Sequence, residues 1–292
     1  MQMARQVEMV FWDVQHGHAT YIKTPNNRHI VIDLGIGDYF GRDMTFSPLK
    51  YLKAKRGINQ LDYVIITHPH LDHIDDILNF DLLNPKVLWR PSSLSNEEVM
   101  DGVQEKDRAK FIKYCEINNR YNTPIAPDSD NNINNPDNWG GLSIKMFYAL
   151  GCDHKNFNNF SPITTFEFAG YKAIIPGDNE SASFAELLED RNFISAIQNA
   201  NVLLAPHHGR ESGYSAEFMS KVNPHITIVS DGRFCDTSAN NRYSQKSQGW
   251  QVSKRNGTSS TRKCLTTNSD GSVSVAFGYR DDNNAFLSVQ IA

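Results

Sequence analysis

The sequence predicts an α/β protein in which two β-sheets pack face to face and helices cover both outer faces, a four-layer αβ/βα sandwich. Two observations predict this fold class. The chain begins with a meander of short strands, continues with helices that alternate with buried strands, and then repeats the same order. Its 292 residues are 39% hydrophobic and 11% aromatic, which is the composition of a globular chain that can bury a sizeable core.

The first half of the chain supplies one sheet and its helices. Three short β-rich segments, at 7–14, 20–24 and 29–34, are separated by turn residues and read as a meander. The continuous apolar run at 61–67 is typical of a strand that is buried on both faces. The other elements expected here are a helix at 47–55 that ends at Gly57, a helix at 72–80, a strand at 86–89, a helix at 95–118 with a capping box of Ser95 and Glu98, and an exposed excursion at 122–141.

The second half is again rich in strands and then alternates with helices. A hairpin is expected around Gly170. The expected strands are 142–148, 164–168, 171–175, 201–205, 225–230, 272–277 and 286–291, and the expected helices are 180–190, 193–199 and 215–222. We therefore expect a single domain over residues 1–292 with a helical and loop insertion at about 91–141.

Charge and hydropathy exclude two classes of protein. The 29 Lys+Arg and 33 Asp+Glu residues give a formal net charge of −4, which excludes a generally polycationic binder. The longest apolar runs, such as 202–205, are far shorter than the roughly 18 residues that cross a bilayer. Glu8 interrupts the stretch that would have to be the apolar part of a signal peptide. We expect a cytoplasmic protein that does not act at a membrane.

The strongest chemical signal is the run Thr-His-Pro-His-Leu-Asp-His at 67–73, where a buried strand ends and a helix begins. His68 and His70 are two residues apart, so an extended backbone points both imidazoles to one side. Asp72 and His73 open the helix and reach a second point nearby. This geometry predicts two metal ions, one bound by His68 and His70 and the other by Asp72 and His73. The alternative is a loop of solvated histidines.

The run resembles the His-x-His-x-Asp-His signature of the metallo-β-lactamase superfamily, and the resemblance implies the metallo-β-lactamase αβ/βα four-layer sandwich. It also implies a later Asp that bridges both metals, which is Asp178 here, and a later His, for which the chain offers His207 and His208. One of these two binds metal, and the other orients a ligand, donates a proton to a leaving group or packs under the strand. The family's third ligand at the first metal is a loop histidine. His154 is the candidate, with a solvated loop side chain as the alternative.

Within the superfamily, the chain resembles the metallo-β-lactamase domain of ComEC-type DNA-uptake proteins. Five segments carry the likeness: 13–19, 33–35, 158–161, 177–178 and 207–210. Gln15 and His18 stand where the family pattern has Gly and Asp, and Arg210 stands where it has Ser. These departures leave the implied metal ligands in place and concern the substrate.

Together these residues predict a metal-dependent hydrolase. Two divalent ions would hold a bridging hydroxide as the nucleophile and neutralise charge on a phosphoryl or carbonyl oxygen. The His-rich ligand set favours zinc, with manganese as the alternative. Catalytic roles are expected for Asp72, His208 and His18. His16 and His18, on the turn after the first strand, bind or protonate substrate unless that turn is simply solvated.

A local charge asymmetry predicts the substrate class. The stretch 237–269 contains no acid but six cations, a basic lobe made of Arg242, Lys246, Lys254, Arg255, Arg262 and Lys263. Such a lobe suits contact with a nucleic-acid backbone unless it is only a solvated face. The residues expected to bind substrate are His16, Arg210, Arg242, Lys246, Lys254 and Arg255.

Three functions therefore compete. The favoured one is a phosphodiesterase or nuclease that cleaves DNA or RNA, with nucleic acid as the partner. The second is a small-molecule hydrolase, such as a lactonase, a β-lactamase-like enzyme or a small phosphodiesterase. The third is a binding module with a structural metal.

Overall fold

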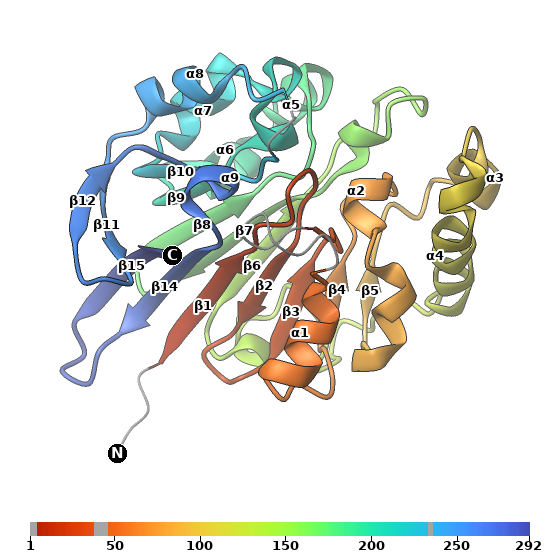
Figure 1. Ribbon diagram of the computed structural model, residues 1–292, viewed down its shortest axis with the longest axis horizontal. Coiled ribbons are helices and arrows are strands. Elements are labelled where there is room, and N and C mark those ends of the chain that lie inside the picture. Colours follow the sequence, from red (N-terminus) through yellow and green to blue (C-terminus); the bar gives the residue numbers. More distant parts are fainter. Residues whose placement is uncertain (1–4, 38–45, 233–235) are drawn as a thin grey trace.

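The structure is a computed structural model that describes residues 5–37, 46–232 and 236–292. Two β-sheets pack face to face in the middle of the molecule, and helices cover the outer face of each sheet (Figure 1). This is the four-layer αβ/βα arrangement that the order of elements predicts, and the prediction of fold class is confirmed.

The larger sheet combines the two ends of the chain. Its strands are β1 (Gln6–Phe11), β2 (Thr20–Lys23), β3 (His29–Ile32), β4 (Tyr63–Ile65), β5 (Leu88–Trp89), β11 (Trp250–Lys254), β12 (Ser259–Arg262), β14 (Val273–Tyr279) and β15 (Ala285–Ile291). They lie in the order β12-β11-β15-β14-β1-β2-β3-β4-β5. The antiparallel pairing of β1 with β14 joins the N-terminal meander to the C-terminal strands. From β3 to β5 the neighbours are parallel, so their carboxyl ends lie at one edge.

The smaller sheet has its parallel strands at one side. Its strands are β6 (Ser143–Phe147), β7 (Ile163–Phe168), β8 (Tyr171–Ile175), β9 (Val202–Leu204), β10 (Ile226–Val229) and β13 (Cys264–Thr266), in the order β13-β10-β9-β8-β7-β6. The expected hairpin joins β7 to β8 through Ala169 and Gly170, whose φ angles of 54° and 80° match a tight turn of positive φ. The neighbours β8, β9, β10 and β13 are parallel, which again brings their carboxyl ends together.

Three buried clusters hold the layers together. The first lies between the sheets, where Met9 of β1 and Phe166 of β7 share one core. The second lies under α1 (Pro48–Lys55), the 3-10 helix η2 (Ile77–Leu83) and α4 (Arg108–Arg120), on the outer face of the larger sheet. The third lies under α5 (Ser181–Leu187), α6 (Arg191–Ile197), α7 (Ala216–Val222) and α8 (Asn240–Lys246), on the outer face of the smaller sheet.

Two expected helices are interrupted. The helix expected at 95–118 consists of α3 (Asn96–Met100), the short η3 (Glu105–Asp107) and α4, with Gly102 at a φ of 68° between them. The capping box of Ser95 and Glu98 is present at the start of α3. The helix expected at 72–80 is shorter too, with α2 (Leu71–Ile74) followed by η2. A left-handed residue cannot continue a right-handed helix, which explains the first break.

The sequence missed the elements of the basic lobe. It did not predict α8, β11, β12, β13 or α9 (Thr267–Asp270). β12 reads Ser-Ser-Thr-Arg and is almost wholly exposed, so it carries no apolar alternation. Its strand structure comes from antiparallel pairing with β11. Propensity and patterning do not detect an edge strand of this kind.

The excursion at 122–141 is exposed over most of its length but is anchored at its end. Apart from the 3-10 helix η4 (Pro136–Trp139), it is made of turns and bends. The indole of Trp139 is 0% exposed, packs edge-on against Tyr63 and lies 4.0 Å beneath the Arg28 guanidinium. Trp139 thus belongs to the core between the two sheets. The single domain with an insertion at 91–141 stays a prediction.

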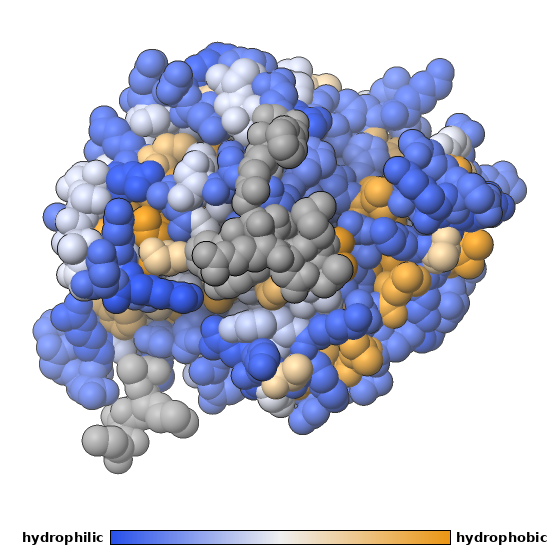
Figure 2. Space-filling model, viewed as in Figure 1, coloured by the Kyte–Doolittle hydropathy of each residue, from blue (hydrophilic) through white to orange (hydrophobic). Residues whose placement is uncertain are grey.

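Figure 2, viewed from the same side as Figure 1, shows a mostly hydrophilic face. Figure 2 shows apolar surface on the side where α2, β5 and α4 lie. In the described part of the chain, no helix has the length and apolar character that a bilayer crossing requires.

Candidate metal centre

The predicted ligands meet where strands from both sheets end. The run 67–73 follows β4 of the larger sheet, Asp178 follows β8, and His207 and His208 follow β9 of the smaller sheet. Gly177 permits close packing here, because its φ is 60° and an added Cβ would lie 2.6 Å from the Ser161 Cβ and 3.1 Å from the Cβ of Thr67, which follows β4 of the other sheet. The packing of two sheets therefore brings together side chains that are more than a hundred residues apart.

Four donor atoms, from Asp72, His73, Asp178 and His208, gather around the Nε2 atoms of the two histidines and are called here the four-donor set. Asp178 Oδ2 lies 3.3 Å from both His73 Nε2 and His208 Nε2, and these two nitrogens are themselves 3.3 Å apart. Asp72 Oδ2 lies 3.4 Å from His208 Nε2 and 3.9 Å from His73 Nε2. A tetrahedron with metal–ligand bonds of about 2.0–2.1 Å has edges of about 3.3 Å. Four of these five separations are within 0.1 Å of such an edge, so the set is suited to a small divalent metal ion.

A second set shares Asp178 and is less complete. His68 Nε2 lies 3.0 Å from His70 Nδ1 and 3.9 Å from Asp178 Oδ2. The Oγ atoms of Thr67 and Ser161, at 3.1 Å and 3.2 Å, occupy the other ring nitrogen of His68 and keep its Nε2 directed at the set. Three protein donors leave positions open for water or substrate, which is typical of a catalytic metal rather than a structural one.

The loop after β9 separates His207 from His208. Both residues have left-handed backbones, with φ of 47° and 54°, and a left-handed conformation at two consecutive non-glycine residues stores strain that is found mainly at functional sites. His208 Nδ1 donates to the Ser230 carbonyl at 2.9 Å, which points Nε2 at Asp72 and His73. The structure therefore brings His208 into the four-donor set.

His207 belongs to a different chain of contacts. Its Nδ1 lies 3.0 Å from Glu180 Oε1, and its Nε2 lies 3.2 Å from Arg210 Nη1 and 3.8 Å from Asp178 Oδ2. Burial lowers the pKa of His207, although Asp178 opposes this effect. The lowered pKa keeps the ring neutral near pH 7. A neutral ring that donates to Glu180 accepts from Arg210 and holds this guanidinium beside the metal centre.

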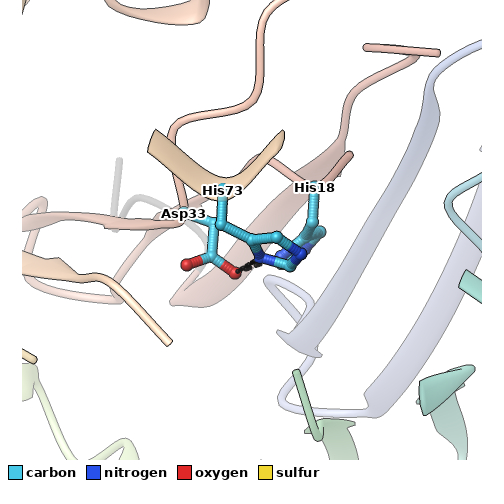
Figure 3. Close-up of side chains that lie close together, drawn as sticks. All are labelled: His18, Asp33 and His73. Atoms are coloured by element: carbon cyan, nitrogen blue, oxygen red, sulfur yellow. Dashed lines mark hydrogen bonds and ion pairs between the residues drawn. The ribbon is translucent and has the colours of Figure 1, made fainter. Parts of the chain in front are cut away.

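A buried carboxylate stands behind His73 (Figure 3). Asp33 is 0% exposed, and its Oδ2 lies 2.8 Å from His73 Nδ1 and 2.9 Å from His18 Nδ1. Burial alone would raise the pKa of Asp33, but His73 and His18 hold it below its usual value. The carboxylate therefore fixes His73 with Nε2 facing the four-donor set, as carboxylates do behind metal-bound histidines.

Carboxylates also set the protonation of the two central imidazoles. Burial favours neutral rings. Asp178, Asp33 and Asp72 nevertheless raise the pKa of His73 well above its usual value. Asp178 and Asp72 raise the pKa of His208 to about 10. The pKa of Asp178 is held well below its usual value by His208 and His73, against the effect of its own burial. Without a metal ion, protons on the two rings neutralise the cluster, and an ion that binds must displace them.

The other histidines expected in the site have separate positions. His18 is 2% exposed and contacts Asp33 and Thr20, so it lies behind His73 and away from the substrate side. His16 is partly exposed, and its Nε2 lies 3.3 Å from Asp72 Oδ2. His154 is exposed and contacts Glu98 and Phe160. The donor sets found in the described residues do not include it.

The structure splits the cations expected to bind substrate. Arg210 lies at the metal centre, where it contacts His207. Arg242 forms an ion pair with Glu211 and lies 3.6 Å from the Tyr214 ring. Lys246 is exposed at the end of α8, while Lys254 and Arg255 are exposed where β11 meets its turn. Figure 1 shows β11 and β12 at the left edge of the molecule, away from α2, so the basic lobe does not form one surface at the metal centre.

Sequence reasoning missed several supporting residues. Glu180 was read only as the start of a helix, and Thr67, Ser161 and Ser230 were not singled out as contacts of the ligands. Asp33 carried a signal, since it lies in the Asp-x-Gly stretch that resembles the family. Its φ of 57° is a second sign that the structure adds.

Comparisons with known proteins agree with this site. A family model described as "Metallo-beta-lactamase superfamily" matches residues 12–218. ComE operon protein 3 of Bacillus subtilis (strain 168) is 26% identical over 252 residues, which are 82% of this chain and 29% of that protein. A UPF0173 metal-dependent hydrolase of Saccharolobus solfataricus is 36% identical over 70 residues, 24% of this chain and 27% of that protein. The chain thus spans less than a third of either relative.

Two solved structures resemble the chain at low similarity. A long form RNase Z from yeast has a TM-score of 0.44 and 12% identity, covering 80% of this chain and 38% of that one. Zn(2+)-bound PqqB from Methylobacterium extorquens has a TM-score of 0.45 and 11% identity, covering 91% of this chain and 99% of that one. Similarity at this level carries no argument about function.

The matched segment covers well over half of the chain and contains every residue of the two donor sets. The match to ComE operon protein 3 supports the ComEC-type resemblance seen in the sequence. The chain belongs to the metallo-beta-lactamase superfamily, and this membership implies divalent metal ions at the site.

Proposed function

We propose that the chain is a phosphodiesterase that cleaves DNA or RNA at a centre of two zinc ions. The observation that carries the proposal is the position of Asp178. Its Oδ2 lies 3.3 Å from the Nε2 atoms of His73 and His208 in the four-donor set and 3.9 Å from His68 Nε2 in the second set. This one carboxylate would therefore contribute to the binding of both ions. Two ions bound there would lower the pKa of a water molecule and offset charge on phosphoryl oxygens.

The protein's own residues then have separate tasks. Asp72, His73, His208 and Asp178 would hold one ion, and His68 and His70 would share Asp178 with the other. Arg210 is held beside them by His207, which Glu180 orients. A guanidinium offers paired donors that match the oxygens of a phosphate. This arginine stands where the ComEC-type pattern has Ser, and it supports a phosphorylated substrate.

The test combines metal content with hydrolysis. Zinc per chain is measured by elemental analysis, and hydrolysis is measured on single-stranded DNA, duplex DNA, RNA and bis(4-nitrophenyl) phosphate. We expect two ions and cleavage of a polymer, lost in Asp178→Ala and in His70→Ala. His225→Ala is the matched control and should stay active, because its ring stacks on Trp250 of β11 and lies outside the donor sets.

Other outcomes would replace the proposal. A protein that binds two ions but hydrolyses only a lactone or a β-lactam is a small-molecule hydrolase. A protein that binds metal and turns over none of these substrates has a structural metal. Either result refutes the phosphodiesterase.

A further inference from the structure

A groove begins beside the open donor set. The 3-10 helix η5 (Phe157–Phe160) places the Phe157 ring 5.8 Å from the His70 ring. At the other end of η5, Phe160 lines a cavity of about 290 Å³ together with Trp89 and Tyr148. The cavity therefore starts one helical turn from the metal centre.

This cavity continues along the edge of the larger sheet. Trp89, Arg90 and Ser92 also line a second cavity of about 650 Å³ beside the edge strand β5. Tyr121 and Ile125, from the segment after α4, form part of its other wall. We call the two cavities together the β5 groove. Its aromatic lining is accessible, since Tyr148 is 47% exposed and stands 5.7 Å from the Trp89 ring.

The groove contains Arg90, a cation whose contacts among the described residues include no carboxylate. Arg90 is half-buried and donates from Nε to Asn118 Oδ1 at 2.7 Å and from Nη2 to the Asn118 carbonyl at 2.9 Å, both neutral oxygens. Burial lowers the pKa of Arg90, opposed by the Tyr114 hydroxyl, and no carboxylate contributes. The neighbouring Lys86 and Arg120 differ, because they pair with Asp62 and Asp81. A partly desolvated charge held by neutral partners favours an anionic ligand.

We propose that the β5 groove binds a single strand of nucleic acid, with a phosphate at Arg90 and bases stacked on Tyr148 and Trp89. This rests on the proposed function, since the strand would continue past Phe157 into the metal centre. Aromatic rings next to a cation that can hold a phosphate are the usual means of binding a single strand. Bases in a duplex are stacked on each other and cannot stack on these side chains.

The test measures binding separately from hydrolysis. Fluorescence anisotropy follows a fluorescein-labelled oligothymidylate of about twelve nucleotides on the full chain, with EDTA present so that nothing is cleaved. Arg90→Gln removes the charge, and Tyr148→Ala removes an exposed ring. The matched controls are Arg191→Gln on α6 and Phe286→Ala on β15, which lie across the molecule from β5 in Figure 1.

We expect the affinity to fall about fivefold or more in Tyr148→Ala, which is the low end of the loss for one stacked base. In Arg90→Gln we expect a similar loss and a salt dependence whose logarithmic slope is smaller by about 0.7, which corresponds to one phosphate contact on a single strand. Both control variants should bind as the wild type does. Circular dichroism confirms that each variant is folded.

Three results would refute the proposal that the β5 groove binds a single strand. The first is equal affinity in all variants, which moves the strand to another surface and leaves the phosphodiesterase intact if hydrolysis persists. The second is wild-type protein that binds no strand but binds a fluorescent acyl chain that Tyr148→Ala loses. The third is equal binding of duplex and single strand. Loss of hydrolysis with normal strand binding refutes the proposed function instead.

Discussion

Replacing Asp33 by Asn tests whether the carboxylate behind His73 sets metal affinity. Asp33 accepts four hydrogen bonds, from Thr67 N at 2.7 Å, Thr67 Oγ1 at 2.8 Å, His73 Nδ1 at 2.8 Å and His18 Nδ1 at 2.9 Å. Asn keeps the shape and tolerates the φ of 57°, so the backbone is not strained. Its NH2 group, however, faces a donor in either orientation, the Thr67 amide in one and both imidazoles in the other.

The magnitude follows from these contacts. Loss of a partner behind a metal-bound histidine typically weakens metal affinity by about 10–100-fold, which is about 1.4–2.7 kcal/mol. A buried donor left without an acceptor costs a further ~1–3 kcal/mol of unfolding free energy. Because the pKa of Asp33 is held below its usual value, its contribution is present above about pH 4 and is lost as the pH falls through the lowered pKa.

The assay is competition for zinc with a chromophoric chelator, together with urea unfolding of the metal-free protein. The control is Asp62→Asn, since Asp62 is 7% exposed and accepts from His29 N at 2.8 Å and Lys86 Nζ at 2.7 Å, away from the centre. The control should lose stability and keep its zinc affinity. The reasoning is refuted if Asp33→Asn binds zinc as tightly as the wild type.

Three further predictions concern protons, ligands and the insertion. Burial favours a neutral His208, but Asp178 raises its pKa to about 10, so their attraction is complete below about pH 6.5 and is lost as the pH rises through 10. Zinc binding at pH 8 should therefore release protons, and calorimetric heats that are the same in all buffers would contradict this. His208→Ala should reduce zinc from two ions to one per chain while His207→Ala keeps both; elemental analysis that finds equal losses would show that the loop is misassigned. Trp139→Ala should lower the unfolding free energy by about 3–5 kcal/mol in urea, since the indole is 0% exposed, and a loss under ~1 kcal/mol would mean that the excursion does not anchor in the core.

The sequence alone determined the fold class and the start of the metal centre. The alternation of strands and helices predicted two covered sheets, because apolar periodicity is set by each element's own burial. His68, His70, Asp72 and His73 could be placed together because they follow one strand within a few residues, so local backbone geometry directs them. Asp178 depended on resemblance to a family, since nothing in its own neighbourhood indicates a partner across the other sheet.

The tertiary structure decided what depends on contacts between distant segments. The Ser230 carbonyl, on another strand end, selects the orientation of His208, while Glu180 draws His207 toward Arg210. His18 lies behind His73 because Asp33 accepts from both rings.

The basic lobe is continuous only in the sequence. Its first part forms α8 over the smaller sheet, and its next part forms β11 and β12 at the edge of the larger one. A charge run reports sequence neighbours, but a binding surface depends on which layer each element joins. Hydrogen-bond partners and sheet pairing, both set by long-range packing, supply that information.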